Sequence, residues 1–290
     1  MAAGPAIVGQ VKNLYLTTPC IGGHINDLTV AAAKVAGIKD IARLGGAQSI
    51  AAFSLGTESI PKVDKIVGPG NAYVAEAKRQ LFGKVGIDSI AGPSEIVILA
   101  NETSSPEIVA WDLMAQSEHD EDASSILIST SSKVIQEVKE IIENESSNLE
   151  RANIIKASLK NNGLIIKVDN LEQSKSLTNR LAPEHLHLAF DTPKIDINDL
   201  VAGIILEGTD SAVALSDYVL GPSHILPTNA SSRFSSPLSV EDFLISSSKV
   251  AIKSESNKGL YNKLAEKTSL IARAEGLTAH AISVEKRKKD

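Results

Sequence analysis

Short apolar runs alternate with amphipathic stretches along most of this chain, and this alternation limits the possible folds more than any other feature of the sequence. In the first third, strands are expected at residues 11–16, 41–44 and 65–67. Helices are expected between and after them, at residues 26–36, 47–55 and 71–82. Strands that alternate with helices through short connections predict parallel sheets covered by helices. The sequence therefore predicts an α/β fold.

A second series of the same kind begins at Glu95. Residues 96–99 are β-branched or leucine, which is typical of a parallel strand buried on both faces. Further helices are expected at residues 106–117, 132–142 and 171–180, and further strands at residues 125–129, 164–168, 186–190 and 204–206. The segment Ile90–Ser94 is the expected boundary between the two α/β units.

The character of the sequence changes after about Pro237. Residues 250–252 form a lone strand-like piece, and two helices are expected at residues 257–274 and 277–288. This part buries little apolar surface by itself, so we expect it to pack on the rest of the protein or on another subunit. We predict three parts, which are an α/β unit at residues 1–94, a second α/β unit at residues 95–237 and a small unit at residues 238–290.

The composition excludes several classes of protein. With 29 Lys and Arg against 35 Asp and Glu, the chain has a formal net charge of −6 and no basic surface for nucleic acid. It has no apolar run of about 18 residues that could span a membrane, and its first residues do not resemble a secretory signal. Cys20 is the single cysteine, which excludes an intrachain disulfide and a zinc site built from cysteines. A cytoplasmic protein without nucleic-acid or membrane partners is predicted.

Gln116 and His119 lie at the end of the helix expected from residue 106. Ser105 can cap this helix and Pro106 suits its first position. Residues three apart share one helix face, so the amide oxygen of Gln116 and the imidazole of His119 could bind one metal ion or polar ligand. The alternative is a solvated helix end, because acidic residues 118 and 120–122 surround His119.

Glu184 and His185 form a second candidate pair. Pro183 disfavours a helical Ala182, so the pair lies in a loop that leads into a strand. A carboxylate beside a histidine among leucines is a plausible acid/base pair, and the alternative is a surface glutamate beside a strand-end histidine. His187 would point to the same sheet face as His185, and one of the two histidines is expected to be structural.

Other polar residues could complete a metal or anion site. Asp217, in the polar loop 216–224, is either a ligand or a turn residue, and His280 is either a ligand or an exposed residue at a helix start. With Gln116 and His119 they offer two oxygen and two nitrogen donors, a set that suits zinc. The loop 68–71 joins a strand to a helix and could leave backbone N–H groups for an anion, although it lacks the G-x-G-x-x-G pattern.

Eight motifs, in order, carry a resemblance to a known family, and they span nearly the whole chain. They are Gly45–Gln48, Pro61–Asn71, Glu76–Gln80, Ala91–Glu95, Gln116–His119, Pro183–Leu186, Ser223–Thr228 and Glu275–His280. Together they closely resemble the histidinol dehydrogenase family. The resemblance implies oxidation of L-histidinol to L-histidine through the aldehyde, the last step of histidine biosynthesis, with two NAD⁺ and one zinc ion.

The resemblance also implies roles for individual residues. Zinc would be held by Gln116, His119, Asp217 and His280, which with His185 would also contact the substrate. Gln48 and Asn71 would contact NAD, and Ser94, Glu275 and His224 would line the substrate site. His185 would accept the alcohol proton, and Glu184 would help activate the water that attacks the aldehyde. Zinc would orient the imidazole and amine of the substrate.

Members of this family are intertwined homodimers, so Glu275 and His280 are expected to reach the partner's active site and residues 238–290 to form a helical dimerisation unit. Relative to the family, the first of two Rossmann-like units is expected to lack its N-terminal half, together with a tyrosine that contacts NAD. The chain alone is therefore expected to be weakly active or inactive. Two rival hypotheses are a dimerising remnant without catalysis and a zinc hydrolase that uses Glu184 with metal-bound water.

Overall fold

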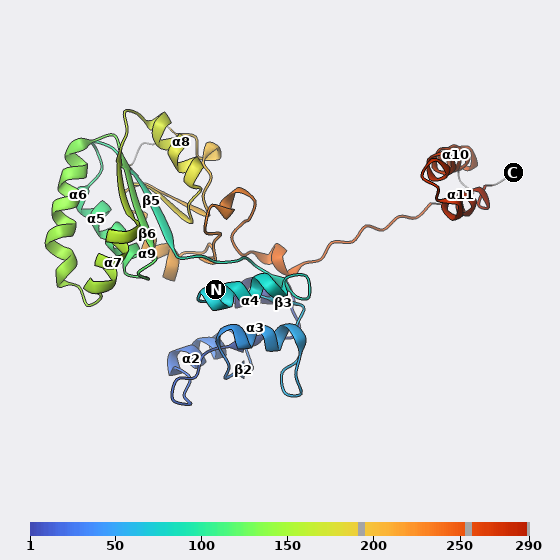
Figure 1. Cartoon of the computed structure of the whole chain (residues 1–290), viewed down its shortest axis with the longest axis horizontal. Helices are drawn as coiled ribbons and strands as arrows, with labels where there is room; N and C mark the ends of the chain where they lie inside the picture. The colour runs from blue at the N-terminus through green and yellow to red at the C-terminus, as the bar shows by residue number, and fades with distance from the viewer. Residues whose placement is uncertain (191–194, 253–256, 289–290) are drawn as a thin grey trace. The chain divides into compact units, whose positions relative to one another are not determined.

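The structure, a computed structural model, describes residues 1–190, 195–252 and 257–288. It divides into two units, Met1–Leu244 and Ile245–Asp290, each of which is described by itself (Figure 1). The predicted α/β class is confirmed, because parallel strands alternate with helices through most of the first unit. No helix among the described residues has the length and apolar character needed to cross a membrane.

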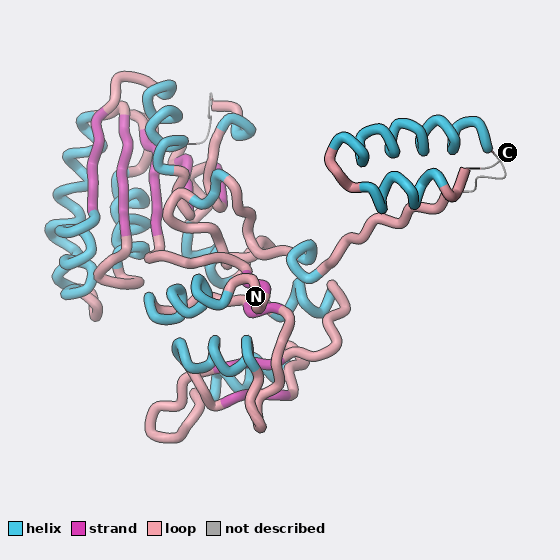
Figure 2. Tube along the Cα trace, turned by 45° about the vertical axis from the view of Figure 1, so that its right-hand side comes forward, coloured by secondary structure: helices cyan, strands magenta, loops and turns pink. Residues whose placement is uncertain are grey.

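A five-stranded parallel sheet is the centre of the first unit (Figure 2). Its strand order is β7-β6-β5-β8-β9. The strands are β5 (Glu95–Ala100), β6 (Ser124–Ser129), β7 (Gly163–Lys167), β8 (His185–Leu188) and β9 (Ile204–Glu207). The chain winds outward from β5 in one direction through β6 and β7, and then returns to add β8 and β9 on the other side, as in a doubly wound fold.

Two apolar cores cover the two faces of this sheet. Ile96 and Ile98 of β5 belong to one core and Val97 and Leu99 to the other, so β5 is buried on both faces as predicted. The first core includes residues of α5, α6 and α9, and the second is bordered by α8. The helices are α5 (Pro106–Ser117), α6 (Ser132–Glu145), α7 (Ala152–Asn162), α8 (Leu171–Leu181) and α9 (Val213–Tyr218), with 3₁₀ turns η1 (Ser146–Asn148), η2 (Ile197–Asp199), η3 (Ser231–Arg233) and η4 (Val240–Phe243).

Residues 1–94 form shorter parallel pairings. Here β1 (Tyr15–Thr17) pairs with β2 (Asp40–Ala42), and β3 (Lys65–Ile66) pairs with β4 (Gly86–Ile87), in two separate sheets. The helices of this part are α1 (Ala3–Val8), α2 (Asp27–Val35), α3 (Gly46–Leu55) and α4 (Ala72–Leu81). Several large apolar side chains of this part are exposed to solvent, among them Ile21, Leu28 and Val35.

The second unit contains a helical hairpin of α10 (Lys258–Ala274) and α11 (Thr278–Glu285). Gly276 makes the turn with a φ of +77°, a value that favours glycine. Both helices were expected, but the predicted strand at residues 250–252 is wrong, since the structure has no strand there. Three apolar residues are too few to specify a strand without a partner strand to supply hydrogen bonds.

The sequence patterns above also do not predict α7 or α9. Helix α7 lacks a side-chain cap, and only Ile155 and Ser158 of it are buried, so its sequence carries a weak signal. Helix α9 has six residues and no side-chain cap, and it lies where a polar loop was expected. Its position matters because it carries Asp217.

Candidate active site

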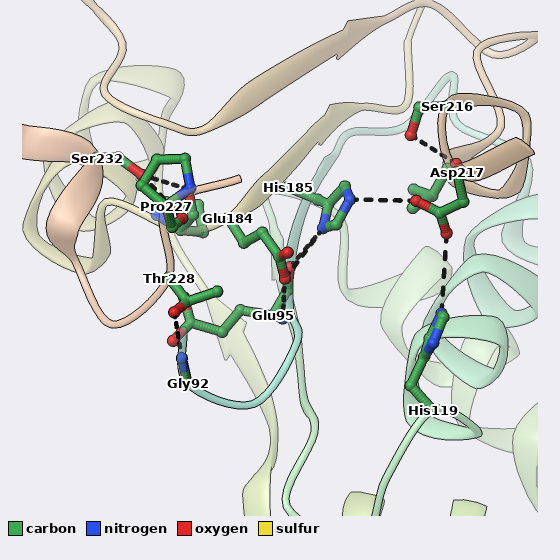
Figure 3. Close-up of polar contacts among 12 residues, drawn as sticks. Gly92, Glu95, His119, Glu184, His185, Ser216, Asp217, Pro227, Thr228 and Ser232 are labelled. Carbon is green, nitrogen blue, oxygen red and sulfur yellow. Dashed lines mark hydrogen bonds and ion pairs between the residues drawn. The ribbon is translucent and has the colours of Figure 1, made fainter. Parts of the chain in front are cut away.

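Four candidate residues of the first unit, Glu184, His185, His119 and Asp217, lie together near the amino ends of strands of the large sheet (Figure 3). His185 begins β8 and Glu95 begins β5, and these two strands are neighbours. Gln116 lies in the last turn of α5, which leads to β6, and Asp217 lies in the last turn of α9, which follows β9. Ligands of open α/β sheets usually bind at the carboxyl ends of the strands. The candidate site is therefore at the opposite edge from the one that fold class alone would indicate.

Glu184 and His185 are both buried, with exposed fractions of 7% and 4%. The structure thus excludes the alternative of a surface glutamate. Glu184 Oε2 accepts a hydrogen bond from the backbone N–H of Glu95 at 2.9 Å, and it lies 3.5 Å from His185 Nδ1. Nδ1 is also 3.1 Å from the carbonyl oxygen of Glu95. A proton on Nδ1 satisfies that carbonyl, so a neutral His185 leaves Nε2 free to accept a proton.

The backbone turns sharply just before Glu184 and His185. Helix α8 ends at Ala182, which has a left-handed φ of +46°, and Pro183 follows. This agrees with the expectation that Ala182 is not helical. The turn sends residues 184 and 185 into β8 instead of continuing the helix.

Asp217 connects the pair to the other candidate residues. Its Oδ1 is 3.5 Å from Nε2 of His185, and its Oδ2 is 3.8 Å from Nε2 of His119. Burial lowers the pKa of His185, but the contacts with Asp217 and Glu184 outweigh burial and raise the pKa from 6.5 to about 9. Burial has the opposite effect on Glu95, because it raises the pKa of a carboxyl group.

A pH dependence of stability follows for the zinc-free protein. The pKa of His185 is higher in the folded chain than its unfolded value of 6.5, so charged His185 contributes its full stabilisation below pH 6.5. We expect this contribution, roughly 3 kcal/mol, to disappear as the pH rises through about 9. Urea unfolding with a chelator present, compared between the wild type and His185→Gln across this range, measures it. Equal pH slopes for the two proteins would contradict the assignment.

Gln116 has the unusual environment of a buried amide without partners. Its exposed fraction is 1%, and neither Nε2 nor Oε1 has a hydrogen-bond partner in the described part of the chain. Gln116, His119 and Asp217 line one pocket of about 190 Å³. A buried amide without partners is costly unless a ligand or ion satisfies it. The pocket thus brings together an amide oxygen, an imidazole nitrogen and a carboxylate oxygen, which are donors that zinc accepts.

Over residues 1–190, 195–252 and 257–288, no cluster of three or more His, Cys, Asp or Glu side chains is arranged to hold a metal ion. The pocket is lined by three such residues, Glu118, His119 and Asp217, and by the amide of Gln116. The fourth predicted donor, His280, lies in α11, and Glu275 follows the end of α10. Both belong to the second unit, so their participation in this site stays a prediction.

The residues predicted to contact NAD lie in the first part of the chain. Gln48 is exposed in the first turn of α3, and Asn71 is exposed as the N-terminal cap of α4, where its Oδ1 accepts the N–H of Val74 at 3.1 Å. Helices α3 and α4 pack against each other. Ser94 precedes β5 beside Glu95, and the buried Nδ1 of His224 has no hydrogen-bond partner among the residues that the structure describes. The predicted roles of these four residues are not tested by the geometry.

His187 is the structural member of the two histidines. It is fully buried, with Nε2 3.0 Å from the carbonyl oxygen of Gly208 and Nδ1 2.9 Å from Oδ2 of Asp112. Asp112 lies one helical turn before Gln116 on α5. The contacts of His187 therefore link β8, which carries His185, to α5, which carries Gln116, and to the segment that leads from β9 into α9, the helix that carries Asp217.

Gly203 and Glu95 are residues that the sequence patterns did not single out. A Cβ atom at Gly203 would lie 2.6 Å from the carbonyl oxygen of Glu184, so only glycine fits beside the candidate pair. Glu95 Oε1 accepts the N–H of Asn229 at 3.1 Å and ties the loop after Pro227 to β5. The motif Ala91–Glu95 contained Glu95, but nothing in the sequence indicated which groups it contacts.

Gly203→Ala tests this close packing. We expect the new methyl group to displace the backbone of Glu184, to reduce stability by about 1–3 kcal/mol and to reduce activity. Thermal unfolding and an activity assay measure the two effects. Gly221→Ala is the matched control, since a Cβ atom there meets no atom within 4 Å. A Gly203→Ala protein as stable and as active as the control would show that the backbone can yield without cost.

Comparisons with known proteins identify the family that this chain resembles. The family model described as histidinol dehydrogenase matches residues 1–288. A histidinol dehydrogenase of Methylococcus capsulatus is 46% identical over 288 residues, which cover 99% of this chain and 65% of that protein. One of Pseudomonas aeruginosa is 46% identical, with 99% and 64% covered. The chain thus spans about 65% of the length of these relatives.

A solved structure is also similar. The crystal structure of histidinol dehydrogenase from Elizabethkingia anophelis matches with a TM-score of 0.89 and 36% sequence identity. The match covers 98% of this chain and 65% of that one. The likeness therefore extends through nearly all of the chain in both sequence and fold.

Proposed function

This chain belongs to the histidinol dehydrogenase family, and we propose that it supplies the active site for the oxidation of L-histidinol to L-histidine, with NAD⁺ as the acceptor of two hydrides. The observation that carries the proposal is the buried Glu184–His185 pair beside a pocket lined by Gln116, His119 and Asp217. A proton acceptor thus lies next to a set of donors that can orient a substrate with an imidazole ring.

The chemistry of the pair follows from its hydrogen bonds. Nδ1 of His185 is held by the carbonyl of Glu95, so Nε2 of the neutral ring is the atom that accepts the proton of the substrate alcohol as hydride leaves for NAD⁺. In the zinc-free chain the ring is charged near neutral pH, because the contacts with Asp217 and Glu184 outweigh burial and raise the pKa to about 9. Zinc bound to Asp217 would take up the charge of this carboxylate and so favour the neutral ring. The product of this first oxidation is an aldehyde, which must add water before a second hydride can leave. Glu184, whose Oε2 is 3.5 Å from His185 Nδ1, accepts the proton of that water. The second oxidation then yields the carboxylate.

The pocket residues fit a zinc ion. The buried amide of Gln116 has no partner within residues 1–190, 195–252 and 257–288, and His119 and Asp217 supply a nitrogen and an oxygen donor beside it. We assign these three residues as ligands, with His280 as the fourth. Zinc, when bound, would act as a Lewis acid that anchors the nitrogen atoms of the substrate. Asp217 also faces His185, so it would align the proton acceptor with the metal site.

The remaining assignments concern NAD and the partner subunit. We assign Gln48 and Asn71 to NAD binding, and Ser94 and Glu275 to the substrate. We also propose a homodimer in which Glu275 and His280 complete the site of the partner. The second unit supports this, because α10 buries only Ala265, Ser269 and Ala272 and leaves large apolar side chains such as Leu270 exposed. In this proposal residues 1–94 contact NAD, residues 95–237 carry the catalytic pair and zinc ligands, and residues 238–290 form the dimerisation unit.

The test is an assay of the purified protein for NADH formation that depends on histidinol, with detection of histidine as product and a measurement of bound zinc. We expect the chain alone to form NADH slowly, in the ratio of two NADH per histidine, and to bind about one zinc per site. Absence of tightly bound zinc together with no NADH formation would favour a dimerising remnant. Hydrolysis of an ester or amide without NAD⁺ would favour a zinc hydrolase. Either result would refute the proposal.

A further inference from the structure

A lysine and an aspartate that the proposed mechanism does not use are buried together at the end of α4. The side chains of Lys78 and Asp88 are only 3% and 4% exposed, and Lys78 Nζ is 2.6 Å from Asp88 Oδ1. Lysine and aspartate are almost never this buried unless they are paired. A buried ion pair must overcome the cost of removing two charges from water, so it is weak evidence for a gain in stability alone.

The other hydrogen bonds of this pair go to a single loop residue. Lys78 Nζ donates to the carbonyl oxygen of Gly68 at 2.5 Å, and the N–H of Gly68 donates to Asp88 Oδ2 at 2.7 Å. One ion pair thereby holds both polar backbone groups of Gly68. The φ of this residue is +113°, which side chains with a Cβ atom rarely adopt. The conformation of the loop between β3 and α4 thus depends on Lys78 and Asp88.

This loop leads directly to a residue assigned to NAD. Asn71 caps α4, and the loop at residues 68–70 determines where its side chain and the first N–H groups of the helix are directed. The first N–H groups of a helix have no acceptor within the helix, and they favour an anion such as a phosphate. Gly70 adds a steric limit, because a Cβ atom there would lie 2.5 Å from a methyl carbon of Val74.

We propose that Lys78 and Asp88 are positioning residues for NAD, which hold the loop at residues 68–71 in the conformation that binds the dinucleotide. The inference rests on the proposed function, since it requires that Asn71 contacts NAD. Neither Lys78 nor Asp88 touches the dinucleotide. They order the loop before NAD binds, so that the entropic cost of ordering it is not subtracted from the binding free energy.

The test replaces the ion pair by apolar side chains. In the double variant Lys78→Met, Asp88→Val, no charge is left unpaired, so the protein can fold, but both bonds to Gly68 are lost. We expect the Kd for NAD⁺, measured by calorimetry on the full chain, to increase at least about tenfold, with bound zinc unchanged. The matched control is Glu76→Gln, Arg79→Met, which removes an exposed ion pair of the same helix that makes no bond to the loop. We expect the control to bind NAD⁺ like the wild type.

Each outcome has a separate meaning. A folded double variant with the Kd of the wild type would overturn the positioning role. A wild type that binds zinc but no NAD⁺ would refute the assignment of NAD itself. If the double variant does not fold, Lys78→Met, Asp88→Asn replaces it, because this variant also leaves no charge unpaired. Asparagine keeps an acceptor for the N–H of Gly68, but the bond from Lys78 to the carbonyl oxygen of Gly68 is lost. We then expect a Kd at least about threefold higher, and an unchanged Kd would again overturn the role.

Discussion

Replacing His185 by glutamine is expected to reduce the rate of NADH formation at saturating histidinol by about 10²- to 10⁴-fold, the usual contribution of a general base. The reason is the arrangement around the ring, in which the carbonyl of Glu95 occupies Nδ1 and leaves Nε2 as the proton acceptor. Glutamine can imitate the bond to that carbonyl, but it cannot accept a proton near neutral pH. Steady-state kinetics with NAD⁺ measures the effect.

Only the loss of the histidine at position 185 should reduce the rate, and the loss of a histidine elsewhere should not. His24→Gln is the matched control, since His24 is an exposed histidine outside the site, and it should have the activity of the wild type. Glu184→Gln should slow the oxidation of the aldehyde more than that of the alcohol, because water must be activated only for the second step. Bound zinc should be unchanged in His185→Gln. A rate within tenfold of the wild type would remove His185 from the role of base.

Replacing Asp217 by alanine is expected to have two effects, because Asp217 faces both His119 and His185. The first is a zinc affinity at least about 100-fold lower, since loss of a direct ligand should exceed the 10- to 100-fold cost of losing a group behind a ligand. The second is a lower pKa of His185 in the zinc-free protein, because Asp217 is the first of the contacts that raise the pKa. Chelator competition measures the affinity, and an NMR titration of His185 measures the pKa.

A nearby carboxylate supplies the control for this variant. Asp210 is exposed in the segment before α9, and Asp210→Ala should change neither zinc affinity nor the pKa of His185. If Asp217→Ala binds zinc as tightly as Asp210→Ala does, Asp217 is not a ligand. If zinc binding is lost while the pKa of His185 is unchanged, the contact between Asp217 and His185 is too weak to adjust the base.

Local sequence patterns were sufficient for much of the fold. The run at residues 96–99 predicted a strand buried on both faces, and Pro106 marked the first residue of α5, which places Gln116 in its last turn. Pro183 predicted the end of α8 and so the position of Glu184 and His185 before β8. These features depend on residues close together in the chain, where propensity and periodicity act directly.

Short elements were less predictable because their local signals are weak. Helix α9 has six residues and no side-chain cap, so Asp217 was expected in a loop. The apolar residues 250–252 resembled a strand, but a strand requires a partner for its hydrogen bonds. In both cases the surrounding structure, and not the segment itself, determined the conformation.

The sequence by itself determined the α/β class, the family and the identity of the candidate residues, because the motifs consist of neighbouring residues in fixed order. Only the tertiary structure decided that Glu184, His185, Gln116 and Asp217 meet at the amino ends of the strands. That meeting depends on the strand order β7-β6-β5-β8-β9, which pairs β8 with β5 across about ninety residues of chain. Burial of the pair follows from this pairing. The contact between Asp217 and His185, which contributes to the raised pKa of His185, follows from the place of β9 beside β8 and of α9 after β9.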